Sequence, residues 1–279
     1  MSIPPAKRRR WLRWFVLALV VVLILAVGGP FVFIHFIEGP PPAKLTLPST
    51  STTQRSSGSS TAGTTTGAPS FAGTWKVGAG SIVGYRVDEV LIGQSTTAVG
   101  RTKKVWGSAV VQGTTVTSAD FTVDMATVKS DQPNRNAQFD GRIMNVSRYP
   151  TASLKLIAPV VLGSAPVVGA TAQQKAKGEL TMHGVTKVIS FTVSVERTSS
   201  GLDVLADIPI LFSDWNIANP SVGGVVTTAN HGILEVLLLL TKGSGNPVST
   251  AGPSSSNFGG SPITVPSTTV PPLNLSSKS

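Results

Sequence analysis

The sequence predicts an all-β domain that follows a membrane-spanning helix. Between Phe71 and Lys242, apolar and polar residues alternate with a period of two through several segments, and turn residues separate these segments. Near the N-terminus, a long run without charged residues predicts the helix. Many short strands over roughly 170 residues favour one closed antiparallel barrel or a sandwich over a βαβ fold.

The chain begins with a basic tip and an apolar span. Residues 1–13 hold five Lys and Arg, and residues 14–37 hold no charged residue. As a helix, those 24 residues would measure roughly 36 Å, enough to cross a bilayer. A cleaved signal peptide is the alternative, but the run is too long and no A-x-A-like site follows it. Because cations hold the adjoining end of a span inside, we expect a single-pass protein of the cell membrane with a cytoplasmic N-terminus and an extracytoplasmic domain.

Two polar segments flank the folded region. Residues 38–70 and 243–279 are rich in Pro, Ser, Thr and Gly. Such segments cannot bury enough apolar surface to offset the entropy lost on ordering. We therefore expect a disordered linker over 38–70, a folded domain over 71–242 and a disordered tail over 243–279.

Four segments of the folded region alternate clearly: SIVGYRVDEVL, SADFTVDMATV, KVISFTVSVE and GLDVLADIPILF. A fifth, GILEVLLLLT, is apolar on both faces, which indicates a strand covered on both sides. One helix is expected over Asn134–Val146, although Gly141 weakens its propensity. The segment GELTMHGVTKVISF predicts a hairpin with His183 and Gly184 at its turn, since glycine favours a positive φ.

Composition and motifs disfavour several function classes. The chain has no cysteine, which excludes disulfides, thiolate metal sites and cysteine nucleophiles. The net charge of +10 falls to +3 over residues 71–242, with 15 Lys and Arg against 12 Asp and Glu, so a nucleic-acid partner is not expected. A zinc site would need both His183 and His231 together with distant carboxylates. No G-x-S-x-G elbow or phosphate-binding glycine loop occurs, so we expect no catalytic residue, no metal and no enzyme activity.

The interior of the predicted barrel leaves two interpretations open. An eight-stranded barrel is just wide enough either to be filled by its own side chains or to hold one small ligand. An apolar interior could bind a hydrocarbon without charge pairing, because each buried CH₂ contributes up to about 0.8 kcal/mol before the costs of association. The pattern of residues therefore allows both a solid core and an apolar container.

The order of the motifs resembles the family of YceI-like domains. The specific pieces are GELTMHGVTK, the YPTAS element at Tyr149–Ser153 and the segment VKSDQPNRN, and the resemblance covers residues 73–242. It implies a lipocalin-like antiparallel barrel of about eight strands with one short helix. It also implies a bound polyisoprenoid or isoprenoid quinone and no other cofactor. Many relatives carry histidines around the first long strand, where this chain has Gly80-Ser81 and Asp88-Glu89, so no role of those histidines is carried over.

We therefore expect a membrane-tethered protein that sequesters or carries an apolar isoprenoid lipid, with homodimerisation left open. The alternatives are a structural or adhesive envelope domain with a filled core, and a hydrolase of a lipid-linked substrate. Phe139 could act as a lid, and Tyr85 and Trp215 could offer polar contacts to a ligand head group. From alternation and motif position, the expected ligand-facing residues are Val83, Tyr85, Val123, Met125, Phe139, Leu154, Leu156, Met182, Phe191, Val193, Ile210, Phe212 and Trp215.

Overall fold

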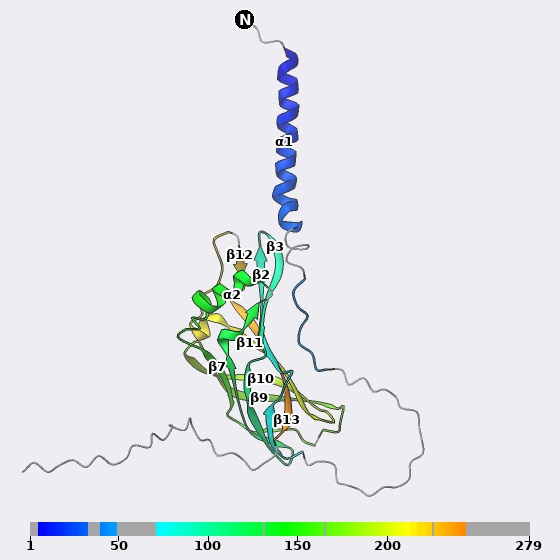
Figure 1. Ribbon diagram of the computed structural model, residues 1–279, viewed down its shortest axis with the longest axis vertical. Helices are drawn as coiled ribbons and strands as arrows, with labels where there is room; N and C mark the ends of the chain where they lie inside the picture. The colour runs from blue at the N-terminus through cyan, green and yellow to red at the C-terminus, as the bar shows by residue number, and fades with distance from the viewer. Residues whose placement is uncertain are drawn as a thin grey trace, which may run out of the picture. The chain divides into compact units, whose positions relative to one another are not determined.

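The computed structural model (Figure 1) describes residues 5–32, 40–48, 71–130, 132–164, 166–224 and 226–243. Its helices and short helical turns are α1 (Pro5–Val32), η2 (Met125–Thr127), α2 (Pro133–Gln138), η3 (Phe139–Ile143) and η4 (Phe212–Trp215). The strands within these residues are β1 (Gly73–Val77), β2 (Ile82–Leu91), β3 (Gln94–Thr102), β4 (Val105–Gln112), β5 (Thr115–Asp124), β6 (Lys129–Ser130), β7 (Thr151–Leu156), β8 (Val160–Val161), β9 (Thr171–Met182), β10 (Val185–Arg197), β11 (Gly201–Leu211), β12 (Val226–Thr228) and β13 (His231–Lys242).

Eight of these strands close into an antiparallel barrel. The hydrogen-bonded order is β1–β4–β5–β7–β9–β10–β11–β13, and β13 pairs back with β1 to complete the ring. Strand β13 is long enough for two strands to share one of its edges: residues 240–242 pair with β1 and residues 233–237 pair with β2. Strand β2 pairs on its other edge with β3, and β3 pairs with the short β6. The closed barrel predicted from the alternation is thus confirmed, and the sandwich alternative is excluded.

The β9–β10 hairpin has the predicted corner. Met182 pairs with Val185, and the two residues between them, His183 and Gly184, have φ angles of 51° and 76°. Positive φ at both central positions is the geometry of a type I′ turn. The Nδ1 atom of His183 lies 3.0 Å from the carbonyl oxygen of Trp215, so Nδ1 must be the donor because a carbonyl only accepts. The histidine therefore ties the hairpin to η4.

The helix expected over Asn134–Val146 is found as two short pieces. Helix α2 begins with Pro133 in its first turn, a position where the missing N–H of proline costs nothing. It ends at Gln138, and the chain continues as the π-helical turn η3 over Phe139–Ile143. Gly141 lies in this wider turn, in keeping with its low helix propensity. Phe139 and Met144 are buried against the barrel interior.

The N-terminal segments match their predictions only in part. Helix α1 forms, but among the residues that the structure describes no helix combines the length and apolar character needed to cross a membrane. Residues 33–37 of the span expected over 14–37 lie outside the described residues, and that span is not confirmed. Of the linker expected over 38–70, residues 40–48 are described and lack regular structure, whereas 49–70 and the tail from 244 lie outside the described residues.

Two carboxylates face each other across β10 and β11. Glu196 and Asp203 are directly paired in the register, and both residues are more than nine-tenths buried. Burial raises the pKa of Asp203, and the neighbouring carboxylate of Glu196 raises it further. Like charges directly opposite each other on a sheet are destabilising, so ionised Asp203 weakens the folded state.

Replacing Asp203 by Asn should therefore stabilise the protein at neutral pH. A folded-state pKa above the ordinary value of 3.8 favours folding at low pH, and this advantage is lost as the pH rises through the raised value. We expect D203N to have a higher Tm than the wild type near pH 7, with the difference shrinking as the pH falls toward 4. Thermal unfolding followed by circular dichroism measures this. The control is D207N, on the exposed side of the same strand, and a D203N variant destabilised equally at every pH would contradict the expectation.

Candidate functional site

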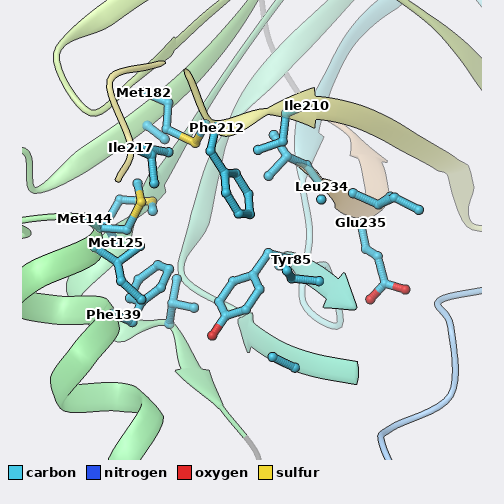
Figure 2. A pocket seen from close by; sticks show the side chains of 18 of the residues that line it. Tyr85, Met125, Phe139, Met144, Met182, Ile210, Phe212, Ile217, Leu234 and Glu235 are labelled. Atoms are coloured by element: carbon cyan, nitrogen blue, oxygen red, sulfur yellow. The ribbon is translucent and has the colours of Figure 1, made fainter. Parts of the chain in front are cut away.

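A cavity of about 510 Å³ lies inside the barrel and opens beside α2 and η3. Its wall is apolar: strands β2, β5, β7, β9, β11 and β13 contribute mainly Val, Leu, Ile, Phe and Met side chains. Figure 2 shows Phe212, Ile210 and Leu234 on one side of this space, with Met125, Met144 and Phe139 across it. Methionines are unbranched and adaptable, so this wall can adjust to ligands of different shape. These residues enclose a cavity and do not form the filled core that the alternative of a structural or adhesive domain predicts.

A second, smaller void of about 100 Å³ continues the apolar interior. Its lining includes Phe71, apolar side chains of β4, β5, β10 and β11, and the C-terminal half of β13. One layer of side chains separates the two voids, since five residues border both: Phe121, Leu154, Ile208, Val236 and Leu238. The interior is thus largely hollow near α2 and more tightly filled toward the other part of the barrel.

Polar side chains gather where the larger cavity opens. Arg135 on α2 forms an ion pair with Glu89 on β2, and both residues border the cavity. Arg142 on η3 is exposed, and its guanidinium donates to the Pro220 carbonyl at 2.9 Å. The mouth is therefore polar and charged, whereas the depth is apolar. This layout suits a molecule with a polar end and a long apolar body.

Two stacked rings stand at the inner edge of the mouth. The rings of Tyr85 and Phe139 are 5.1 Å apart between centroids and inclined by only 10°. Figure 2 shows the two rings beside each other. The tyrosine ring lies close against Gly100 on β3, where an added Cβ would come within 2.3 Å of Tyr85 Cε1. Only glycine leaves room for the ring there. The pair links the η3 turn to the barrel wall, and the role of Phe139 as a lid stays a prediction.

Most residues predicted from the sequence to face a ligand border one of the two voids. Leu156, Phe191 and Val193 border the smaller void, and Leu154 borders both. Whether any of them binds a ligand stays a prediction. The others border the larger cavity: Val83, Tyr85, Val123, Met125, Phe139, Met182, Ile210 and Phe212.

Trp215 is the exception among the expected residues. It lines neither void, is only 2 % exposed, and its indole N–H points to the Leu180 carbonyl at 3.5 Å. The position of Trp215 therefore does not support the expected polar contact between this residue and a ligand head group. The reason is local: Trp215 lies in η4, where the period-2 alternation of β11 has already ended.

Sequence reasoning missed several lining residues. Met144 and Ile217 lie after a helical turn and in a loop, where no simple period assigns a face. Leu234 lies on β13, whose apolar residues on both faces conceal which side is inward. Arg135 and Arg142, by contrast, could have been noted because they are the two cations of the predicted helix over Asn134–Val146.

The described residues contain no cluster of three or more His, Cys, Asp or Glu that could hold a metal ion. Of the two histidines of the barrel, His183 contacts Trp215 and Tyr149, and His231 contacts Asn230. His183 lies in the β9–β10 turn and His231 begins β13, and the two share no partner among these contacts.

A closed antiparallel barrel with an apolar cavity and a polar mouth defines a container of the lipocalin type. A family model for the YceI-like domain matches residues 75–235, more than half of the chain. The chain therefore belongs to the family of YceI-like domain proteins, as the order of motifs indicated.

One solved structure supports this fold, and two others are similar over smaller parts of this chain. A polyisoprenoid-binding domain from Saccharophagus degradans, implicated in plant cell wall breakdown, matches with a TM-score of 0.50 and 14 % identity, over 62 % of this chain and 99 % of that domain. BcnA of Burkholderia cenocepacia is 19 % identical, with a TM-score of 0.44, over 55 % of this chain and 94 % of its own. The YceI protein of Campylobacter jejuni is 16 % identical, with a TM-score of 0.39, over 50 % and 82 %. No curated protein matches the sequence.

The Tyr85–Phe139 stack can be tested by truncation. Replacing Phe139 by Ala removes a buried ring beside an existing cavity, and we expect the free energy of unfolding to fall by about 3 kcal/mol. Denaturant unfolding of F139A and the wild type measures the difference. Trp106→Ala provides the control, because Trp106 is half exposed and its loss should change stability much less. Equal effects of the two substitutions would show that the stack contributes nothing.

Proposed function

We propose that this protein binds an apolar chain lipid, of the isoprenoid class, inside its barrel. The observation that carries the proposal is the cavity of about 510 Å³, with an apolar wall and a polar mouth. The role that we propose for this cavity is binding. The polyisoprenoid-binding relative from Saccharophagus degradans supports the choice of ligand class.

The energetics favour a ligand with a long hydrocarbon body. Each CH₂ removed from water contributes about 0.8 kcal/mol, whereas association costs on the order of 4–15 kcal/mol in lost freedom. A ligand must therefore bury on the order of ten or more such groups to bind well. A chain lipid offers that many, and its polar end, a quinone ring or an alcohol, would lie among Gln132, Arg135 and Gln138 at the mouth.

Extraction of the purified full-length protein tests this function. We expect organic extraction and mass spectrometry to find an isoprenoid lipid in the wild type, and a lower lipid-to-protein ratio in A152F. Ala152 is buried on β7 and borders the cavity, so a phenyl group there occupies ligand volume. T151F, on the exposed face of the same strand, is the matched control and should retain the wild-type amount.

Thermal unfolding must show that A152F is folded. If it is not, A98F replaces it, because Ala98 on β3 also borders the cavity. The absence of isoprenoid from the wild type would overturn the proposed ligand. Equal amounts of lipid in the wild type and in folded A152F would place the lipid outside the cavity.

We also propose that residues 14–37 tether the protein to the cell membrane, with the barrel on the extracytoplasmic side. The support is the uncharged run itself and the five Lys and Arg that precede it. The large apolar side chains of α1 between Trp11 and Leu25 are exposed, which supports an apolar environment around this helix.

Fractionation of cells that produce the full-length protein tests the tether. We expect the wild type in the membrane fraction after carbonate washing, and V20R/L23R to lose it, because each arginine at the centre of a span costs about 2.5–3.5 kcal/mol. The control is T64R/T65R, which adds the same charges outside the span. A wild-type protein released by carbonate, or a V20R/L23R variant that stays bound, would contradict the tether.

A further inference from the structure

Residues 40–48, which we name the strap, lie against the outside of the barrel rather than free of it. The strap belongs to a segment whose composition predicts disorder, yet its Leu45 is only 9 % exposed. Its backbone is held by two arginines of the barrel. Arg86 on β2 donates from Nη2 to the Pro42 carbonyl at 2.7 Å, and Arg101 on β3 donates to the Ala43 carbonyl.

The two arginines are fixed by a single buried carboxylate. Glu235 on β13 accepts from Arg86 Nε at 3.0 Å and from Arg101 Nη2 at 2.8 Å, and its side chain is 1 % exposed. Glu235 borders the cavity, and Figure 2 shows its carboxylate turned away from Phe212 and the methionines. Glu235 and both arginines therefore hold the strap from the outer face.

The register of the strands explains how the cluster assembles. Gly84 on β2 pairs with Glu235 on one side and with Arg101 on the other. A Cβ on Gly84 would lie 2.8 Å from Arg101 Cγ, so a side chain there would obstruct the path of Arg101 to Glu235. The glycine leaves a shallow place across which the guanidinium reaches the carboxylate.

Because Glu235 is buried, its charge must be compensated by hydrogen bonds and opposite charges. Burial alone would raise the pKa of Glu235, but hydrogen bonds and positive charge from Arg101 and Arg86 outweigh it and hold the pKa below its ordinary value of 4.5. The carboxylate thus stays ionised, and buried ion pairs are favourable only when their remaining donors also find acceptors. The Pro42 and Ala43 carbonyls accept from these arginines. The strap therefore completes the cluster.

We propose that the strap is a permanent clamp that ties the segment following α1 to the wall of the barrel formed by β2, β3 and β13. Without it, the 40 residues from 33 to 72 would separate α1 from β1, a reach of up to about 140 Å when fully extended. With the strap docked, only the seven residues 33–39 remain between α1 and the barrel, a reach of at most about 25 Å.

The consequence for the tethered protein rests on the membrane attachment proposed above. A barrel on a long coil could face any direction, whereas a barrel clamped at one wall presents that wall to the end of the span. Strand β2 runs from Arg86, which holds the strap, to Glu89 at the mouth of the cavity, a rise of about 10 Å. The clamp therefore keeps the mouth close to the membrane from which an apolar ligand would come.

Distance measurements between spin labels test the strap in the full-length protein in detergent micelles. The chain has no cysteine, so K44C/K103C carries labels only on the strap and on the β3–β4 turn, both at exposed positions. We expect a single narrow distance distribution in this background. Adding L45S should broaden it severalfold, because the buried leucine is the strap's apolar anchor.

A second variant tests the arginine contacts without removing their charge. R101K keeps the positive charge beside Glu235 but loses the second donor that reaches the strap, so the distribution should broaden again. The control is T46A, at an exposed strap position, which should leave the distribution narrow. A broad distribution in K44C/K103C, or a narrow one that survives both L45S and R101K, would overturn the proposal.

Lipid content and membrane fractionation of the same variants separate this proposal from the earlier ones. L45S should retain its lipid and its membrane attachment, since it changes neither the cavity nor α1. Loss of lipid from the wild type would count against the ligand alone, and a narrow distribution that survives L45S and R101K would count against the strap alone.

Discussion

The fold depends on strand β13, which must satisfy three neighbours at once. One edge pairs with β11 along almost the whole strand, and the other is divided between β1 and β2. Its inward residues border the two voids: Leu234, Val236 and Leu238 border the larger one, and Val236, Leu238 and Leu240 border the smaller one. Its outward Glu235 then lies where β2 and β3 bring Arg86 and Arg101 together. Barrel closure, cavity wall and strap cluster therefore share one element.

Much of the fold could be predicted because most strands have one buried and one exposed face. Alternation assigns Tyr85 and Val123 to the interior without any knowledge of pairing. It gives no such answer for β13, which is covered on both sides, yet that strand carried a different signal. A single glutamate within GILEVLLLLT is a charge in a buried apolar strand, and such a charge requires partners. Their identity depended on the register and could not be read from the sequence.

The candidate site was predictable to the same extent and for the same reason. The cavity wall built from β2, β5 and β11 follows from alternation, whereas Met144, Ile217 and Trp215 lie in turns and loops where no period applies. The strap was hidden because composition averages over a segment. In 38–70 the abundant Ser, Thr and Pro conceal one leucine and two carbonyl groups that find partners on the barrel. Composition predicts the average behaviour of a segment, not the behaviour of each residue in it.

The uneven filling of the interior gives the barrel two mechanical regions. Around the smaller void, near Val111, Leu202 and Leu240, little empty space interrupts the apolar cluster, and its closer packing resists deformation. Around the larger cavity, the wall has empty space on its inner side and loses part of its dispersion contacts. Local opening there costs less free energy than opening of the packed region. Hydrogen exchange should accordingly be fast in α2 and the neighbouring strand ends and slow in the middle of β10 and β11, so that a molecule could enter while the rest of the barrel stays closed.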